Sequence, residues 1–208
     1  MFNVESIDAF PTRIFIIKEP KFLPNVKKVA DQFISKQQKI RPKNKTYPIT
    51  QTENIQNDPL IEDFRDFITG ASVACMENQG FDPSAFDFVF NDMFVQEHRQ
   101  GSGHERHFHA GCVITGFYFL RVPQNPPNAV FYDPRPAKDM GSFFFEKNGT
   151  DLTPATSLIK FTPQEGLFLF TNSWLHHSFE RNESKEPFTL VHFDLFPTPK
   201  SPPEAVVV

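Results

Sequence analysis

The sequence predicts a mainly β (α+β) domain, in which helices near the N-terminus support an antiparallel barrel or double sheet. Helical periodicity is confined to about residues 20–80, whereas short apolar runs separated by turn residues fill about residues 84–196. Phenylalanine occurs 26 times in 208 residues, and aromatic side chains favour strands and fill the space between sheets. Helices followed by strands is the order typical of an α+β domain.

The length and composition indicate one soluble domain. The 208 residues suffice for one hydrophobic core, so we expect a single domain over residues 1–196 and a proline-rich arm or disordered tail over residues 197–208. The net charge of −4 gives no electrostatic footprint for nucleic acid or an anionic membrane. Cys75 and Cys112 fit a reducing compartment. Since we find neither a signal-peptide pattern nor an apolar run of membrane-spanning length, we expect a cytoplasmic protein.

The first part of the chain is predicted to be mostly helical. Residues 10–17 form an expected early strand that is entered by a proline. Pro24 begins a helix whose apolar side chains recur with a period of 3.6 residues. Residues 36–48 are basic and interrupted by proline, which is typical of a solvated loop. A capping residue and a proline at 57–59 begin a second helix that ends near Gly80.

After Pro83 the pattern changes to that of strands, and the turns between them are rich in proline, asparagine and glycine. The open end of such a double sheet is a usual place for a small-molecule site. Strands are predicted at about residues 86–95, 101–109, 113–122, 129–132, 143–145, 157–161, 167–170 and 188–196.

Histidines gather in two short stretches. Three of the seven lie within Gly101–His109, and two more stand side by side at His176 and His177. Because side chains alternate along a strand, His107 and His109 would point to the same face. The same alternation allows only one of the downstream pair to face them. Histidine is the commonest metal ligand, so this spacing predicts a transition-metal site.

The residues alone leave the metal open. Three protein ligands on one face of iron leave positions for a chelating cosubstrate and dioxygen, but such sites usually contain two histidines and one carboxylate. Glu105 shares the strand face of His107 and is a candidate ligand or a neighbour of the ligands. Three histidines and a water also suit catalytic zinc. A cupin-like metalloenzyme is a further interpretation, because Gly101 and the histidine pair match the start of the first cupin motif, although its glutamate is missing.

The flanks of the histidine stretches narrow these interpretations. His107-Phe108-His109 is followed after five residues by Thr115-Gly116-Phe117-Tyr118, and residues 163–179 contain Ser173-Trp174-Leu175-His176-His177. Together with residues 131–135, these blocks resemble the H-x-H … S-G-V-Y-Y, f-x-D-P-R and S-W-L-x-H segments of a family of 2-oxoglutarate/Fe(II)-dependent oxygenases from marine bacteria and their phages. The resemblance extends from residue 9 to about residue 195. It implies a double-stranded β-helix (jelly-roll) core, Fe(II) and 2-oxoglutarate.

Carried over residue by residue, the resemblance points to His107, His109 and His177 as metal ligands, because His177 occupies the histidine of S-W-L-x-H. Four other residues are expected in the pocket or beside the ligands, with Trp174 as a core residue next to the site. They are His104, Glu105, Trp174 and His192.

The family also has an arginine in its last core strand, which pairs with the distal carboxylate of 2-oxoglutarate. The corresponding residues 187–194 contain neither arginine nor lysine, and a carboxylate buried without a partner is costly. Lys185 lies at a spacing similar to the basic residue of prolyl-hydroxylase-like relatives and is the first substitute to test. Tyr118 and Thr189 offer hydroxyls to the cosubstrate. Weaker cationic candidates are Arg121, Lys160, Arg181 and a protonated His192.

The sequence therefore predicts an Fe(II)/2-oxoglutarate-dependent dioxygenase that hydroxylates an unidentified substrate, either a peptide side chain or a small metabolite. The resemblance implies a bacterial or phage origin, and hence the host cytoplasm for a phage protein. A second hypothesis is a non-enzymatic metal-binding β-barrel of a virion or assembly, favoured by the missing arginine, the missing carboxylate and the proline-rich tail. A third is a cupin-like metalloenzyme that does not use 2-oxoglutarate.

Overall fold

The computed structural model describes residues 2, 5–40, 49–136, 138 and 152–200, and its core is two antiparallel sheets. The larger sheet has the strand order β1-β8-β5-β10-β3-β2, and the smaller has the order β4-β9-β6-β7. The strands are β1 (Ile14–Lys18), β2 (Ile49–Asn54), β3 (Phe86–His98), β4 (His104–His107), β5 (Ile114–Arg121), β6 (Ala129–Tyr132), β7 (Leu158–Phe161), β8 (Leu167–Asn172), β9 (His177–Phe179) and β10 (Phe188–Pro199).

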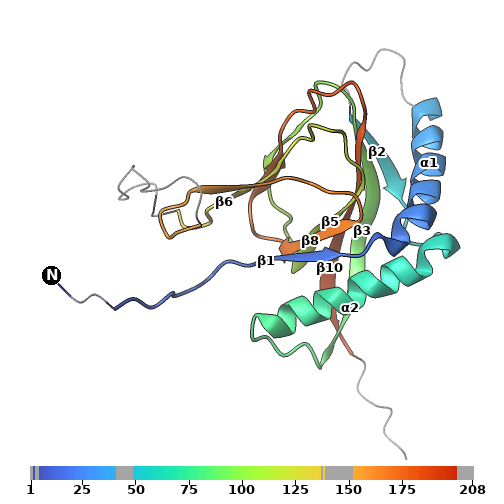
Figure 1. The fold of residues 1–208 in the computed structure, drawn as a ribbon. Coiled ribbons are helices and arrows are strands. Elements are labelled where there is room, and N and C mark those ends of the chain that lie inside the picture. Colours follow the sequence, from blue (N-terminus) through green and yellow to red (C-terminus); the bar gives the residue numbers. More distant parts are fainter. Residues whose placement is uncertain (1, 3–4, 41–48, 137, 139–151, 201–208) are drawn as a thin grey trace, which may run out of the picture.

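Two helices cover the outer face of the larger sheet (Figure 1). Each follows a short 3₁₀ turn, so that η1 (Pro20–Phe22) leads into α1 (Leu23–Ile40) and η2 (Pro59–Ile61) leads into α2 (Glu62–Asn78). The side chain of Asp58 caps the second turn by accepting a hydrogen bond of 2.9 Å from the backbone N–H of Leu60. The apolar faces of both helices pack against the sheet, because burying one large apolar side chain contributes about 1.5–3 kcal/mol.

Alternation along the central strands separates the hydrophobic residues into two clusters. On β5, Tyr118 packs with the helices, whereas Phe117 and Phe119 lie in a second cluster between the two sheets. On β10, Val191 packs with the helices, and Leu190 lies between the sheets. Because residues from both sheets share this second cluster, it is the interior of the barrel.

A glycine in β5 permits the close packing of this sheet. A Cβ atom on Gly116 would overlap the ring of Phe193 on β10 and the backbone carbonyl of Leu169 on β8. Only a residue without a side chain lets the three strands approach in this way.

The predicted fold class is confirmed, and several boundaries differ. Strand β2 was not predicted, because its polar sequence forms an edge strand that buries only Thr50 and Thr52. The expected strand over residues 101–109 is shorter, since β4 ends at His107. Strand β10 continues into the expected tail, to Pro199. Its pairing with β5 ends at Leu195, so the prolines lie where only β3 is paired and no second ladder needs their missing N–H.

Some expectations fall outside the described residues. The strand predicted at residues 143–145 and the end of the tail at residues 201–208 belong to these parts of the chain. Within the described part, no helix combines the length and the hydropathy needed to cross a membrane.

Candidate metal centre

Three histidines meet at one end of the barrel interior. Strands β4 and β9 pair so that His107 lies directly opposite His177. His109 follows β4 by two residues and is held by a 2.9 Å hydrogen bond from its backbone N–H to the carbonyl of Ser173. The ring centroids lie 4.5 Å (His107–His177), 5.1 Å (His107–His109) and 5.3 Å (His109–His177) apart. One ring nitrogen of each lies within 4.8 Å of the others, which brings the three predicted ligands together.

Hydrogen bonds determine which ring nitrogen of His107 and of His177 is free to bind a metal. The Nδ1–H of His107 donates to the carbonyl oxygen of Glu105 at 2.6 Å, and the Nδ1–H of His177 donates to that of Leu175 at 3.0 Å. In a neutral imidazole the other nitrogen, Nε2, then carries a lone pair. The Nε2 of His177 is buried and has no hydrogen-bond partner among the described residues. A buried polar atom without a partner is costly, and a metal ion would satisfy it.

The protonation state of these rings suits metal binding. Burial lowers the pKa of His177 from 6.5 to about 3. Burial also lowers the pKa of His107, and the neighbouring His109 acts in the same direction. Metal ligation requires the neutral imidazole, so the fold prepares both rings for it near pH 7.

A carboxylate stands behind the third histidine. The Nδ1 of His109 lies 2.8 Å from Oδ2 of Asp194, a buried residue on β10. Burial raises the pKa of the Asp194 carboxyl, but the hydrogen bond from His109 and the neighbouring His192 outweigh burial and hold the pKa below 3.8. The ionised carboxylate therefore orients His109 and directs its Nε2 away from Asp194. Ligand histidines in metalloproteins commonly have such a carboxylate partner.

A second set of possible ligands overlaps the first. His109, His192 and Asp194 also offer ligand atoms within 4.8 Å of one another. The Nε2 of His192 lies 3.3 Å from the Nε2 of His109, and burial lowers the pKa of His192 to about 3. However, Oδ2 of Asp194 already accepts the hydrogen bond from His109. Its Oδ1 is buried without a hydrogen-bond partner among the described residues, so Asp194 still offers a ligand atom. We follow the set of His107, His109 and His177, which the sequence predicts and in which Asp194 orients His109.

The comparisons with known proteins identify the chemistry that this site serves. A family model described as "Putative 2OG-Fe(II) oxygenase" matches residues 92–194, which contain all of these histidines and Asp194. The chain belongs to the 2-oxoglutarate/Fe(II)-dependent oxygenases. Fe(II) is therefore the metal of the oxygenase and 2-oxoglutarate its cosubstrate, and three imidazoles, one of them with a buried and unpartnered Nε2, fit the metal. Among curated protein sequences, none matches this chain.

Solved structures share the fold at low sequence identity. AviO1 from Streptomyces viridochromogenes has a TM-score of 0.61 and 10% identity over 92% of each chain. A Pseudomonas putida prolyl-4-hydroxylase has a TM-score of 0.57 and 9% identity over 89% of this chain and 92% of that one. The viral collagen prolyl hydroxylase of Paramecium Bursaria Chlorella virus-1 has a TM-score of 0.51 and 14% identity over 88% and 94%. The architecture of the oxygenase is the double-stranded β-helix.

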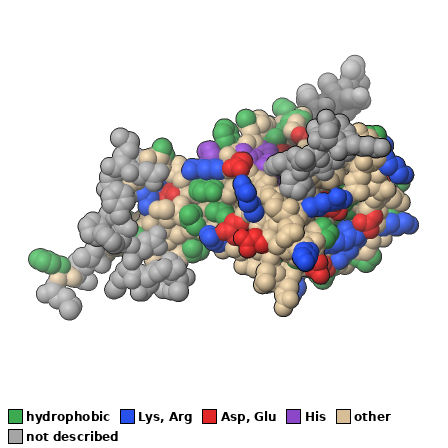
Figure 2. All heavy atoms as spheres, turned by 90° about the horizontal axis from the view of Figure 1, so that it is seen from above, with side chains coloured by type: hydrophobic (Ala, Val, Ile, Leu, Met, Phe, Trp, Pro, Cys, Tyr) green, Lys and Arg blue, Asp and Glu red, His purple; other side chains and the backbone are tan. Residues whose placement is uncertain are grey.

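The residues predicted beside the ligands occupy different environments. The ring of His104 lies 4.1 Å from that of His107, centroid to centroid, and burial lowers the pKa of His104 to about 4. Glu105 is exposed, so only its backbone carbonyl serves the site. Trp174 is 47% exposed, which corrects the expectation of a core residue. Histidine side chains reach the surface together at one place, beside charged and hydrophobic residues (Figure 2).

Two of the three predicted cosubstrate contacts, Tyr118 and Thr189, face away from the barrel interior, whereas the role of Lys185 stays a prediction. Tyr118 faces the helices, where its hydroxyl donates a 3.0 Å hydrogen bond to the carbonyl of Glu19. Thr189 alternates with Phe188 and Leu190, which face the interior, and so it points to the helical side. Lys185 is exposed in the loop before β10. Both faces of β5 and β10 are buried, so the sequence did not show which face is the interior.

The weaker cationic candidates also lie elsewhere. Arg121 pairs with Asp31 of α1 at 2.9 Å, and Lys160 pairs with Glu180 at 2.7 Å. Arg181 is exposed.

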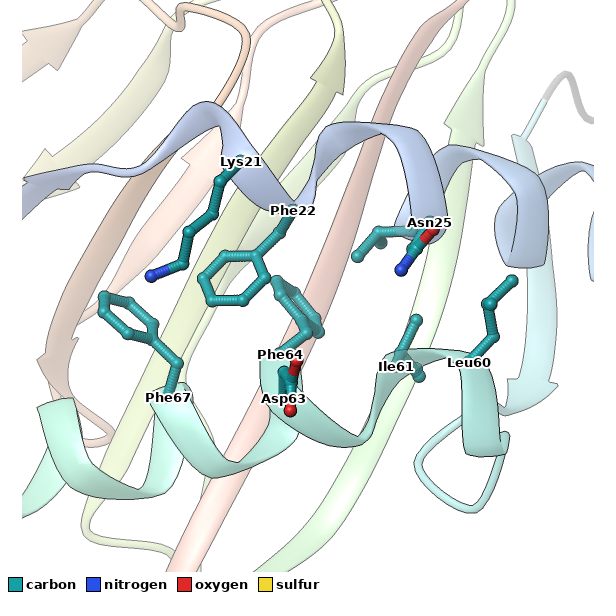
Figure 3. A pocket seen from close by; sticks show the side chains of 9 residues that line it. Lys21, Phe22, Asn25, Leu60, Ile61, Asp63, Phe64 and Phe67 are labelled. Carbon is teal, nitrogen blue, oxygen red and sulfur yellow. The ribbon is translucent and has the colours of Figure 1, made fainter.

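A cavity of about 510 Å³ lies on the opposite side of the larger sheet (Figure 3). It opens between η1–α1 and η2–α2, and its walls include Phe22, Phe64 and Phe67. Its lining contains no histidine, so this cavity is separate from the metal centre.

Proposed function

We propose that this oxygenase hydroxylates a C–H bond of its substrate, with His107, His109 and His177 as the ligands of Fe(II). When bound, the metal and 2-oxoglutarate supply the oxidation: one oxygen atom of O₂ enters the C–H bond, and the other enters the succinate that forms with CO₂. The observation that carries the proposal is the buried, unpartnered Nε2 of His177, which is close to the ligand nitrogens of the two other histidines. Family membership favours this function over the non-enzymatic barrel and the cupin-like enzyme.

The chain itself positions the ligands and excludes water from one side. The carbonyl oxygens of Glu105 and Leu175 and the carboxylate of Asp194 each orient one imidazole. The ring of Phe117 packs edge-on against His177 at 5.2 Å and closes the interior beneath the ligands. His109 and His107 are only half-buried, so a substrate reaches the site from their side.

The experiment that tests the ligand set compares adjacent histidines. His176 lies on the other side of the strand, where its ring contacts Phe108 at 4.9 Å. We expect His177→Ala to abolish Fe(II) binding and His176→Ala to retain most of it, measured by metal analysis and by the weak visible band that Fe(II) and 2-oxoglutarate give without oxygen. Equal loss in both variants, or loss in His176→Ala alone, would contradict the ligand set.

We propose a peptide side chain as the first substrate class to test, with small metabolites as the second. Support comes from two structurally similar proteins, a viral collagen prolyl hydroxylase and a Trichoplax adhaerens prolyl hydroxylase in complex with a peptide fragment. The half-exposed rings of Phe108 and Trp174 flank the histidines in sequence and offer apolar surface at the rim. Succinate release above the substrate-free rate, compared between a peptide library and a metabolite library, distinguishes the two classes. The bacterial or phage origin stays a prediction.

A further inference from the structure

The distal carboxylate of 2-oxoglutarate needs a partner inside the barrel. The stretch that corresponds to the family's arginine strand, residues 187–194, contains neither arginine nor lysine. Phe188 near its start is fully buried against Phe119 and Phe179. A phenyl ring offers no hydrogen bond to a carboxylate. A carboxylate transferred from water to an apolar interior without a partner is strongly disfavoured. Another polar group in the interior must therefore take this role.

Strand β3 supplies polar side chains directly beside this position. In the antiparallel pairing of β3 with β10, His98 lies opposite Phe188 and Gln96 lies opposite Leu190. Directly paired residues of two antiparallel strands share a face of the sheet. Since Phe188 and Leu190 belong to the interior cluster, His98 and Gln96 also face the interior. Ring contacts of His98 with Phe179 and Phe188, at 5.9 and 5.8 Å, agree with this placement.

A hydrogen-bonded relay fixes the orientation of the Gln96 amide. Nδ1 of His98 lies 3.0 Å from Oγ of Ser102, and its Nε2 lies 3.4 Å from Oε1 of Gln96. Burial lowers the pKa of His98 to about 3, so the ring is neutral and donates through one nitrogen. Ser102 then donates to Nδ1, and the Nε2–H donates to Gln96. This assignment turns the amide NH₂ of Gln96 away from His98.

That amide NH₂ has no other role in the described structure. Gln96 is 1% exposed, and its Nε2 is buried without a hydrogen-bond partner among the described residues. The relay beneath it is rigid, because the side-chain amide of Asn182 donates to the carbonyl of His98 at 2.9 Å and its backbone N–H donates to the carbonyl of Ser102 at 2.7 Å. A fixed, buried donor without a partner indicates a ligand acceptor.

We infer that Gln96, oriented by His98 and Ser102, binds the distal carboxylate of 2-oxoglutarate in place of the missing arginine. The distance along β3 from the metal centre to Gln96 suits the length of 2-oxoglutarate. His192, next to the ligand His109, pairs with Phe94, and Gln96 is two residues further along β3 on the same face. Two residues of a strand span about 6.6 Å, which is comparable to the five-carbon chain of the cosubstrate. This inference rests on the proposed metal centre at His107, His109 and His177.

The test measures keto-acid binding without turnover. The Fe(II)-loaded protein is titrated without oxygen with 2-oxoglutarate and with 2-oxopentanoate, which has a methyl group in place of the distal carboxylate. The wild-type protein should prefer 2-oxoglutarate. Gln96→Leu should weaken its binding by roughly 10- to 100-fold, the usual effect of losing a hydrogen bond to a charged group, and should leave 2-oxopentanoate binding unchanged. Gln96→Glu, which places like charges together, should weaken 2-oxoglutarate binding further.

The matched control is Gln100→Leu, the same substitution in an exposed turn, which should keep the wild-type preference. Fe(II) binding and thermal unfolding of each variant report whether the fold is intact. The inference is overturned if folded Gln96→Leu and Gln96→Glu keep the preference, if Lys185→Met removes it instead, or if the wild-type protein binds both keto acids equally. Wild-type protein that binds Fe(II) but neither keto acid would overturn the proposed function as well.

Discussion

At the scale of single residues, the proposed ligand set has a histidine in place of a carboxylate, and a carboxylate accepts a hydrogen bond from that histidine. His109 stands where iron oxygenases usually have an acidic ligand, and the buried Asp194 accepts its Nδ1–H at 2.8 Å. The negative charge is thus kept close to the metal centre but outside the ligand set. An imidazole whose far nitrogen donates to a carboxylate is a more basic ligand than a free imidazole. This arrangement gives the neutral ligand part of the character of the missing anion.

Changing Asp194 tests this role. Asp194→Leu leaves the Nδ1–H of His109 without an acceptor, so we expect Fe(II) affinity to fall by roughly 10- to 100-fold, as for other lost partners of ligand histidines. Asp194→Asn keeps an acceptor but removes the charge, and its affinity should be intermediate. Asp87→Asn, an exposed aspartate of β3, is the control and should bind normally. Competition with a chelator measures the Fe(II) affinity of each variant. If Asp194→Leu bound Fe(II) as tightly as the wild-type protein, Asp194 would have no role in metal binding.

At the scale of the elements, β5 connects the two clusters and tolerates little change. Gly116→Ala would push a methyl group into the Phe193 ring and the Leu169 carbonyl, and overpacking of a core typically costs about 1–3 kcal/mol of unfolding free energy. Gly70 offers the matched control. It lies in α2 with no atom within 4 Å of an added Cβ, and alanine there should stabilise the helix by about 0.5–1 kcal/mol. Urea unfolding of both variants measures the two effects. A neutral Gly116→Ala would show that the strands separate readily.

The same elements show what the sequence could and could not predict. Alternation placed His107 and His109 on one face, because it depends on local spacing. His177 was selected only by the resemblance of the S-W-L-x-H block, and the pairing of β4 with β9 brings it opposite His107. The roles of Asp194 and Gln96 depend on the long-range pairing of β10 with β3, which no local pattern contains. Tyr118 was misplaced for a related reason. Both faces of β5 are buried, and a continuous apolar run does not indicate which face is the interior.

At the scale of the whole molecule, the barrel interior contains a group of neutral histidines. Burial lowers the pKa values of His98, His177 and His192 from 6.5 to about 3 each. They come from three different strands, β3, β9 and β10, so the group links both sheets. Their neutrality is a property of the folded state, since the unfolded chain exposes them to water.

Stability of the metal-free protein should therefore fall as the pH decreases. Between the folded pKa of about 3 and the unfolded value of 6.5, the unfolded state binds more protons at each of these histidines. The unfolding free energy then rises with pH, by up to about 1.4 kcal/mol per pH unit for each histidine. The contribution of these histidines to the unfolding free energy is complete above pH 6.5 and is lost progressively as the pH falls below 6.5.

Between about pH 6.5 and about pH 4.5, the pH dependence of the unfolding free energy comes from the buried histidines and not from carboxylates. Carboxylates with lowered pKa values, such as Asp133 and Asp194, lose their stabilising charge only below their unfolded values near 4. Urea unfolding in chelator at several pH values within this window measures the slope. His98→Leu removes one titrating ring from the interior and should flatten the slope. An unfolding free energy that stays constant between pH 7 and pH 5 would mean that the interior accepts charged imidazoles, and the neutral ligand set would then lose its physical basis.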